Sequence, residues 1–160
     1  MLNKAIFLDR DGVINHENGY TTSLSEFKIL PDVLLNLKKW QELGYLLFII
    51  SNQGGISKGL FTQQELEKMH TFFLDESKKA GVSISEIYYC MHHPQSNSGK
   101  CICRKPDSVM LEKAIARFSI DPKQSYFIGD KDTDMQAAQK AGIKGILVPI
   151  NDSLNKINIH

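Results

Sequence analysis

The sequence predicts an α/β protein: a Rossmann-like, doubly wound parallel sheet of about five strands with helices on both faces. Short apolar runs alternate with amphipathic segments along the chain, as in sheets whose parallel strands are joined by helices. Most apolar runs also end in a group of polar residues, as expected where the carboxyl ends of strands open into a ligand site. No long insertion interrupts this alternation, so no large cap domain is expected.

The elements of this sheet follow from apolar periodicity and from Gly or Pro at their ends. The apolar runs before Asp9 and Ser51 predict the first two strands. Thr62 and Glu65 have the spacing of a capping box, which begins a helix. In chain order, the predicted elements are strand 4–8, helix 31–43, strand 45–50, helix 62–80, strand 84–89, helix 108–118, strand 125–128, helix 132–141 and strand 145–148.

Length and composition limit the class of protein. The 160 residues fit one domain, predicted at 1–150 and followed by a polar tail at 151–160. A net charge of +1 argues against a broad nucleic-acid surface. The longest apolar run, 45–50, is too short to cross a bilayer, and no signal-peptide pattern is present. We therefore expect a cytoplasmic monomer without nucleic-acid or membrane partners.

Polar clusters follow three of the predicted strands. They are Asp9-Arg10-Asp11-Gly12, Ser51-Asn52-Gln53 and the cluster that begins at Gly129-Asp130-Lys131, while Arg104-Lys105 precedes a predicted helix. Because parallel strands end at one edge of the sheet, these segments are expected to form one pocket. Taken alone, an Asp-x-Asp-Gly sequence is equally typical of an acidic turn. Helix capping would explain Asp132 or Thr133, but it leaves Asp130 unexplained.

These four segments together resemble the signature motifs of the haloacid dehalogenase (HAD) superfamily of phosphatases. Asp9-Arg10-Asp11-Gly12-Val13-Ile14, Ser51-Asn52-Gln53, Arg104-Lys105-Pro106 and Gly129-Asp130-Lys131 occur in the superfamily's order and on the corresponding elements. The resemblance covers about residues 4–149. It implies a magnesium-dependent phosphoric monoester hydrolase that forms an aspartyl phosphate.

The resemblance also implies a role for each polar residue. Asp9 is expected to be the nucleophile, and Asp11 the general acid and base, with a pKa raised by desolvation and neighbouring carboxylates. Asp9, Asp130 and the backbone carbonyl of Asp11 would hold Mg²⁺, which offsets the charge of an anionic phosphate. Ser51 and Lys105 would bind the phosphoryl oxygens.

One further carboxylate has two interpretations. Asp134 follows Asp130 by four residues and falls in the first turn of the helix predicted at 132–141. There it would either orient Lys105 or a metal-bound water, or cap the helix at the surface.

The three cysteines of the chain lie in one short segment with a histidine. Cys90-Met91-His92 is followed by Cys101-Ile102-Cys103, and three thiolates with one imidazole match a closed tetrahedral Zn²⁺ site. The alternative is three small buried cysteines beside an unrelated histidine. Spacing favours His92 as the fourth ligand but does not exclude His93. The zinc would be structural and would fix the loop 90–103, so that the adjoining Arg104-Lys105 faces the substrate.

Within the superfamily, the zinc loop narrows the resemblance to the histidinol-phosphatase-like group. The chain is most similar to the phosphatases of D-glycero-D-manno-heptose 1,7-bisphosphate, and less to those of histidinol phosphate. This similarity implies a sugar phosphate substrate, removal of its 7-phosphate, and a place in making heptose precursors of lipopolysaccharide. Substrate binding is assigned by the resemblance to Glu17, Asn18, Gly19, Tyr20, Asn52, Gln53, Gly54, Arg104 and Lys131. Arg104 would bind the remote part of the substrate by bidentate hydrogen bonds.

Two functions of other kinds fit parts of the sequence. A catalytically silent, zinc-stabilised binding module would keep the cysteine loop, but it would not need the intact motif carboxylates. A DNA-end phosphatase would keep the motifs, but it would need a basic patch for many phosphate contacts. Magnesium-dependent phosphate release would separate an enzyme from a binding module.

Overall fold

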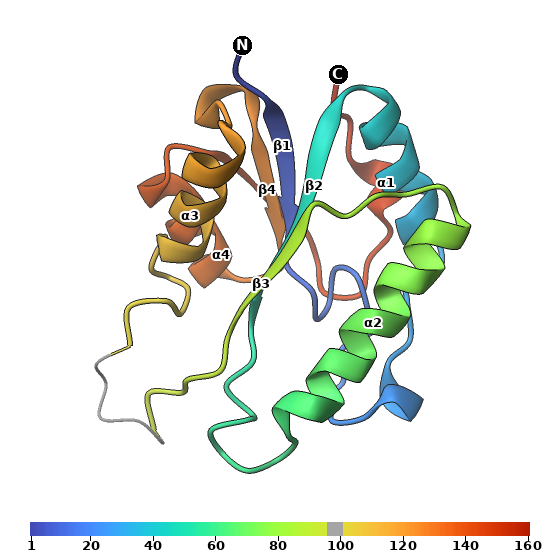
Figure 1. Ribbon diagram of the computed structural model, residues 1–160, viewed down its shortest axis with the longest axis vertical. Helices are drawn as coiled ribbons and strands as arrows, with labels where there is room; N and C mark the ends of the chain where they lie inside the picture. Colours follow the sequence, from blue (N-terminus) through green and yellow to red (C-terminus); the bar gives the residue numbers. More distant parts are fainter. Residues whose placement is uncertain (96–100) are drawn as a thin grey trace.

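The computed structural model describes residues 1–95 and 101–160, and it has the predicted fold class (Figure 1). Within these ranges, five parallel strands form one sheet in the order β3-β2-β1-β4-β5. The strands are β1 (Lys4–Leu8), β2 (Tyr45–Asn52), β3 (Glu86–Cys90), β4 (Tyr126–Gly129) and β5 (Lys144–Leu147). The helices are α1 (Val33–Glu42), α2 (Gln63–Lys79), α3 (Val109–Phe118) and α4 (Asp132–Lys140), with short 3-10 helices at Leu24–Glu26, Pro122–Gln124 and Leu154–Lys156. Part of the predicted cysteine loop, residues 96–100, lies outside the described ranges.

Helices cover both faces of the sheet because its central strands are apolar on both sides. Successive side chains of a strand point to opposite faces. Along β1, Ile6 and Leu8 belong to the core that includes α1 and α2, whereas Ala5 and Phe7 belong to the core that includes α3 and α4. The two helix pairs lie on opposite sides in Figure 1. The doubly wound arrangement is therefore confirmed.

The capping box predicted for α2 is present. The Thr62 hydroxyl accepts a hydrogen bond from the Glu65 N–H at 3.1 Å, and the Glu65 carboxylate accepts one from the Thr62 N–H at 2.7 Å. These two bonds satisfy N–H groups that have no partner within the helix. The reciprocal cap fixes where α2 begins, and therefore which of its side chains face the sheet.

The segment 151–160 differs from the polar tail that the sequence predicts. It contains the 3-10 helix Leu154–Lys156, and the side chains of Leu154, Ile157 and Ile159 are buried in the same core as α1 and α2. Asn155 also accepts a hydrogen bond from Asn36 of α1 at 2.8 Å. The spacings between the three apolar residues, three and then two, do not repeat one period, which is why periodicity does not reveal their burial.

The direction in which strands are added to the sheet reverses between β1 and β4. The chain adds β2 and β3 on one side of β1, and then β4 and β5 on the other. In open α/β sheets, ligands bind at such a switch point, beyond the carboxyl ends of the strands. The loops after β1, β2 and β3 all lie at the lower end of Figure 1.

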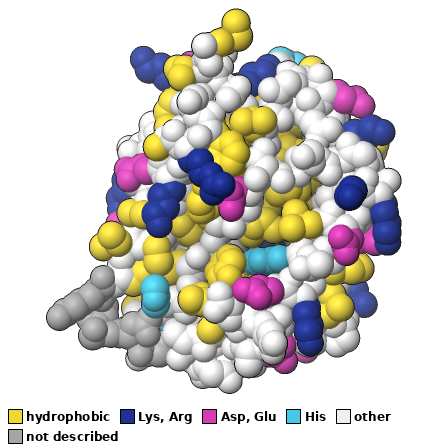
Figure 2. Space-filling model, in the orientation of Figure 1, with side chains coloured by type: hydrophobic (Ala, Val, Ile, Leu, Met, Phe, Trp, Pro, Cys, Tyr) yellow, Lys and Arg dark blue, Asp and Glu magenta, His cyan; other side chains and the backbone are white. Residues whose placement is uncertain are grey.

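The surface adds two observations. The edge strand β3 is half-buried over Glu86–Tyr89, and Figure 2 shows hydrophobic side chains grouped in the middle of this face. Among the helices in the described ranges, each is too short or too polar to span a bilayer.

Candidate active site

Three carboxylates meet at the switch point. Asp9 directly follows β1, Asp130 directly follows β4, and Asp134 lies in the first turn of α4. Each offers an oxygen within 4.8 Å of the others. Asp134 is 1% exposed and Asp9 is 5% exposed, so water does little to screen the repulsion between their charges. Such a group needs cations beside it.

Asp130 has the properties of a cation ligand. Its Oδ1 atom is buried and has no hydrogen-bond partner among the described residues. Burial raises the pKa of Asp130 to about 8, and the neighbouring Asp9 adds to the rise. A divalent cation stabilises the charged form of a carboxyl that has a raised pKa and a buried oxygen without a hydrogen-bond partner. Hard oxygen donors are those that Mg²⁺ prefers, so the residues present fit this metal.

Lys105 supplies a fixed positive charge in the same place. Its Nζ lies 2.9 Å from Asp9 Oδ1 and 2.7 Å from Asp134 Oδ1, and it donates to the backbone carbonyl of Ile50 at 2.8 Å. Burial acts to lower the pKa of Lys105, but Asp9 and Asp134 outweigh it and hold that pKa above its ordinary value. Asn52 holds the lysine backbone from both sides, donating to the Lys105 carbonyl and accepting from its N–H. The ammonium group is therefore charged and fixed.

Asp11 lies beside this group and is held by hydrogen bonds on both oxygens. Its Oδ1 accepts from Arg10 Nη2 at 2.6 Å and from Asn15 at 2.9 Å, and its Oδ2 accepts from Gln53 at 2.8 Å. The expected rise in the pKa of Asp11 is wrong for this arrangement. Burial acts to raise the pKa, but the Arg10 charge and the hydrogen bonds from Arg10, Asn15 and Gln53 leave it below its ordinary value.

Ser51 and Gln53 connect the end of β2 to Asp11. The Gln53 amide donates to Ser51 Oγ at 2.7 Å as well as to Asp11, and Ser51 is fully buried. The amide nitrogen of Gln53 is thus occupied by protein groups. Gln53 controls the position of Asp11 in addition to lining the pocket.

A cavity of about 690 Å³ opens above these residues, within the usual size of a small-molecule site. The segments at the carboxyl ends of β1, β2, β3 and β4 form its wall. The lining residues are Asp9, Asp11, Glu17, Gly19, Tyr20, Thr21, Asn52, Gln53, Gly54, His93, Pro94, Cys101, Arg104, Lys105, Pro106, Asp107, Lys131, Thr133 and Asp134. A Cβ atom at Gly54 would come within 3.0 Å of His93 and Arg104, so only glycine lets these two side chains approach the loop so closely.

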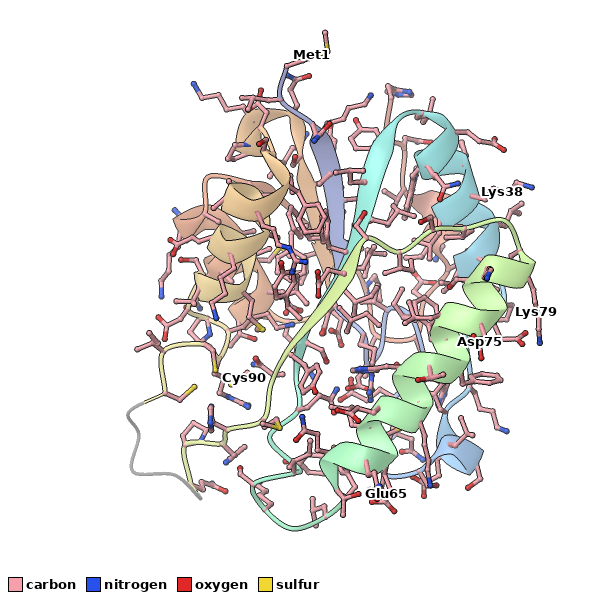
Figure 3. The ribbon with its side chains drawn as sticks, viewed as in Figure 1. Met1, Lys38, Glu65, Asp75, Lys79 and Cys90 are labelled. Atoms are coloured by element: carbon pink, nitrogen blue, oxygen red, sulfur yellow. The ribbon has the colours of Figure 1, made fainter. Side chains whose placement is uncertain are left out.

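The cysteines and one histidine form a second cluster beside this wall. The donor atoms of Cys90, His92, Cys101 and Cys103 all lie within 4.8 Å of one another. The three sulfur–sulfur distances are 3.4, 3.1 and 2.7 Å, and His92 Nδ1 lies 3.2–3.5 Å from the sulfurs. Figure 3 shows Cys90 at the carboxyl end of β3. Three thiols and one imidazole that converge in this way are the donor set of a closed tetrahedral Zn²⁺ site.

The two neighbouring histidines have different places. His92 points its Nδ1 atom at the sulfurs, whereas His93 lines the cavity near Gly54 and Arg104. The sequence leaves this choice open, and the structure brings His92 to the cysteines.

Known proteins resemble this chain over most of its length. A D-glycero-beta-D-manno-heptose-1,7-bisphosphate 7-phosphatase of Haemophilus ducreyi is 42% identical over 146 residues, which cover 88% of this chain and 80% of the relative. A D-glycero-alpha-D-manno-heptose-1,7-bisphosphate 7-phosphatase of Photorhabdus laumondii is 39% identical over 144 residues, covering 88% and 79%. The chain belongs to this phosphatase family. The HAD-hydrolase-like family model also matches residues 102–153.

A solved structure agrees with this assignment. The D,D-heptose 1,7-bisphosphate phosphatase from B. bronchiseptica, complexed with magnesium and phosphate, superposes with a TM-score of 0.83 at 30% identity, over 90% of this chain and 79% of that one. The resemblance to the HAD superfamily drawn from the motifs is therefore confirmed, and the chain is a phosphatase.

Most residues predicted for the phosphatase site come together in the structure. Asp9, Asp11 and Lys105 line the cavity with most of the predicted substrate-binding residues. Asn18, Ser51 and Asp130 are not part of the cavity wall as far as the structure describes it. Lys131 Nζ pairs with Glu17 Oε1 at 3.2 Å.

Several residues of this region lack a sequence signal for their place in it. Thr21, His93, Pro94 and Thr133 line the cavity although no motif assigns them there. Asp134 orients Lys105 through Oδ1, as the first interpretation predicts, and its Oδ2 caps α4 by accepting the N–H groups of Asp130 and Lys131. The expected surface position is wrong, because Asp134 is buried. Its spacing of four residues from Asp130 is the signal that points to this place.

Proposed function

We propose that the chain removes the 7-phosphate of D-glycero-D-manno-heptose 1,7-bisphosphate and leaves heptose 1-phosphate, a precursor of surface heptose. The observation that carries this proposal is the ion-paired group of Asp9, Lys105 and Asp134 at the switch point of a chain in the heptose bisphosphate phosphatase family. The related B. bronchiseptica structure holds magnesium and phosphate, the two chemical groups that such a site needs.

In the proposed reaction, Asp9 is the nucleophile. Its carboxylate attacks phosphorus in line, the sugar alkoxide leaves, and water then hydrolyses the aspartyl phosphate. Lys105 and Ser51 donate to the phosphoryl oxygens, where negative charge is held in the transition state. Asp9, Asp130 and the backbone carbonyl of Asp11 would hold Mg²⁺, which offsets the charge of the phosphate when bound.

Asp11 gives a proton to the leaving alkoxide and later takes one from the attacking water. A carboxyl with a lowered pKa is a poor acid until its surroundings change. The negative phosphate of a bound substrate raises the pKa of a nearby carboxyl, because it adds like charge. Substrate binding would therefore prepare Asp11 for its first step.

The remote part of the substrate would lie against the loops that carry the predicted binding residues. Arg104 would bind the second phosphate by bidentate hydrogen bonds, since its guanidinium is always charged. The other proposed contacts are Glu17, Asn18, Gly19, Tyr20, Asn52, Gln53, Gly54 and Lys131. Lys131 already pairs with Glu17, which brings a cation to the cavity wall.

The Cys90, His92, Cys101 and Cys103 cluster would hold a structural Zn²⁺. Four protein donors close the coordination sphere, so the metal would not carry out chemistry itself. Arg104 directly follows Cys103 and donates to the backbone carbonyl of His92 at 3.1 Å, which couples its position to the cluster. We further propose a monomer in the cytoplasm, since three cysteines without a disulfide bond fit a reducing compartment.

The test compares phosphate release from both heptose bisphosphate anomers and from histidinol phosphate, with and without Mg²⁺. We expect the highest kcat/KM for a heptose bisphosphate. Asp9→Asn should lose at least about 10³-fold in kcat while its circular dichroism spectrum is unchanged. A preference for histidinol phosphate would overturn the substrate, and turnover by Asp9→Asn near the wild-type rate would overturn the nucleophile.

A further inference from the structure

A buried histidine from α2 contacts the arginine that holds Asp11. His70 Nε2 lies 3.3 Å from Arg10 Nη1, and the two side chains are 7% and 1% exposed. Arginine only donates hydrogen bonds, so Nε2 is the acceptor and the proton of the neutral imidazole is on Nδ1. This contact joins residues 60 positions apart in the chain.

The guanidinium of Arg10 is used on two sides. Its Nε and Nη2 atoms donate to Asp11 Oδ1 at 3.2 and 2.6 Å, while Nη1 faces His70. Its Cζ atom lies 5.4 Å from the centre of the Phe27 ring. Because the guanidinium is planar and its donors are fixed, a group that accepts a hydrogen bond from Nη1 also orients Nε and Nη2. The histidine, the ring and the carboxylate together define one orientation of this group.

We propose that His70 is a positioning residue for Asp11, acting through Arg10. This inference rests on the proposed role of Asp11 as the general acid. His70 keeps the guanidinium turned so that Asp11 Oδ1 stays on Nε and Nη2, while Gln53 holds Oδ2. Asp11 is thereby kept at the edge of the cavity, close to where the leaving oxygen would lie.

If position 70 only had to fill space in the core, an apolar side chain would be sufficient. His70 lies on the inner face of α2 beside Leu66, Met69 and Phe73, all of which are buried and apolar. Placing an imidazole in such a row costs desolvation unless it gains a hydrogen bond. The hydrogen-bonding partner is Arg10, while the Tyr89 ring makes an edge contact with the imidazole at 5.5 Å. The acceptor atom, rather than the volume of the side chain, explains a histidine at position 70.

The test compares His70→Gln, which offers an oxygen acceptor, with His70→Leu, which fills space without one. Phe73→Leu, on the same buried face, is the matched control for loss of packing. We expect His70→Leu to lower kcat/KM for the alkyl phosphate that the wild-type enzyme hydrolyses best by about 10-fold, through kcat, because proton transfer depends on placement of the acid. His70→Gln and Phe73→Leu should stay within about twofold of wild type.

A second substrate separates positioning from general damage. The nitrophenolate of p-nitrophenyl phosphate leaves without needing a proton, so His70→Leu should hydrolyse it with a kcat/KM within about twofold of wild type. An equal loss on both substrates, or no rescue by His70→Gln, would overturn the proposal.

Crystal structures of the variants give a readout that does not depend on turnover. Asp11 should stay on Arg10 in His70→Gln and should move away from it in His70→Leu. An unmoved Asp11 in His70→Leu would overturn the positioning role even if the wild-type chain proved inactive on heptose bisphosphates. A wild-type chain without that activity would overturn only the proposed substrate.

Discussion

Lys105 and Asp134 form an ion pair of 2.7 Å although their side chains are only 3% and 1% exposed. A buried ion pair gives little net stability over an apolar pair, but removal of one partner leaves the other charge without compensation. The ion pair of Lys105 and Asp134 therefore affects both the stability of the fold and the geometry of the site.

Asp134→Asn should lower the free energy of unfolding by about 2–3 kcal/mol. The loss is smaller than for a fully unpaired buried charge, because Lys105 keeps its ion pair with Asp9. Urea unfolding monitored by fluorescence measures the change. Asp132→Asn, an exposed site on the same turn, is the control and should stay within about 0.5 kcal/mol. Equal stability of Asp134→Asn and wild type would contradict the prediction.

Gly129→Ala should strongly lower activity because Gly129 packs against Asp134. A Cβ atom at Gly129 would lie 2.4 Å from Asp134 Cβ and Oδ2, and that side chain is fixed by Lys105. Gly145→Ala is the matched change on the neighbouring strand, where the new Cβ meets the flexible end of Met135 at 2.7 Å. Steady-state kinetics should give at least a 100-fold loss in kcat for the first variant, about 2.7 kcal/mol of activation energy, and little loss for the second. Similar losses in both would argue against the special role of this contact.

Stability should fall below neutral pH because of His70. Burial, with the Arg10 charge, lowers the pKa of His70 from 6.5 to about 3 in the folded chain. Between these two values the unfolded chain binds the proton and the folded chain does not, so acid favours unfolding. The contribution of neutral His70 to the free energy of unfolding is complete above pH 6.5. It is lost as the pH falls toward 3, by at most about 1.4 kcal/mol per pH unit.

His70→Gln removes the titrating group and should lose less stability than wild type between pH 7 and pH 5. Denaturant unfolding at the two pH values measures the difference. Identical pH dependence in wild type and variant would show that His70 is not the group responsible.

Loss of the Zn²⁺ proposed for the cysteine–histidine cluster should weaken substrate binding and leave the chemistry of the carboxylates unchanged. Purified protein should contain one zinc per chain by elemental analysis, and Cys103→Ser should contain none. We expect this variant to raise KM by about 10-fold, since groups that orient a site often contribute that much. Ile102→Ser changes an exposed residue between two ligands and should keep both zinc and KM. Full zinc content with an unchanged KM in Cys103→Ser would reject the predicted ligand set.

The sequence predicts the sheet, its order of elements and the catalytic motifs because these depend on local patterns. Asp9 and Asp130 end buried strands, and strand ends in a parallel sheet have few alternative places. Local patterns do not reveal the contact between Arg10 and His70, because it depends on how α2 packs on the sheet. The lowered pKa of Asp11 is missed for the same reason, since its causes include Arg10 and the amide of Gln53 from another loop.

Cys90 and His92 precede the segment 93–100, and Cys101 and Cys103 follow it, so the cluster of these four residues holds both ends of the segment. Arg104 and Lys105 directly follow Cys103, and Asn52 of β2 independently anchors the backbone of Lys105. A change in length between His92 and Cys101 should therefore leave these two cations in place. His93, Pro94 and Cys101 line the cavity, so substitutions there should change the wall of the substrate site and leave the carboxylates of phosphoryl transfer in place.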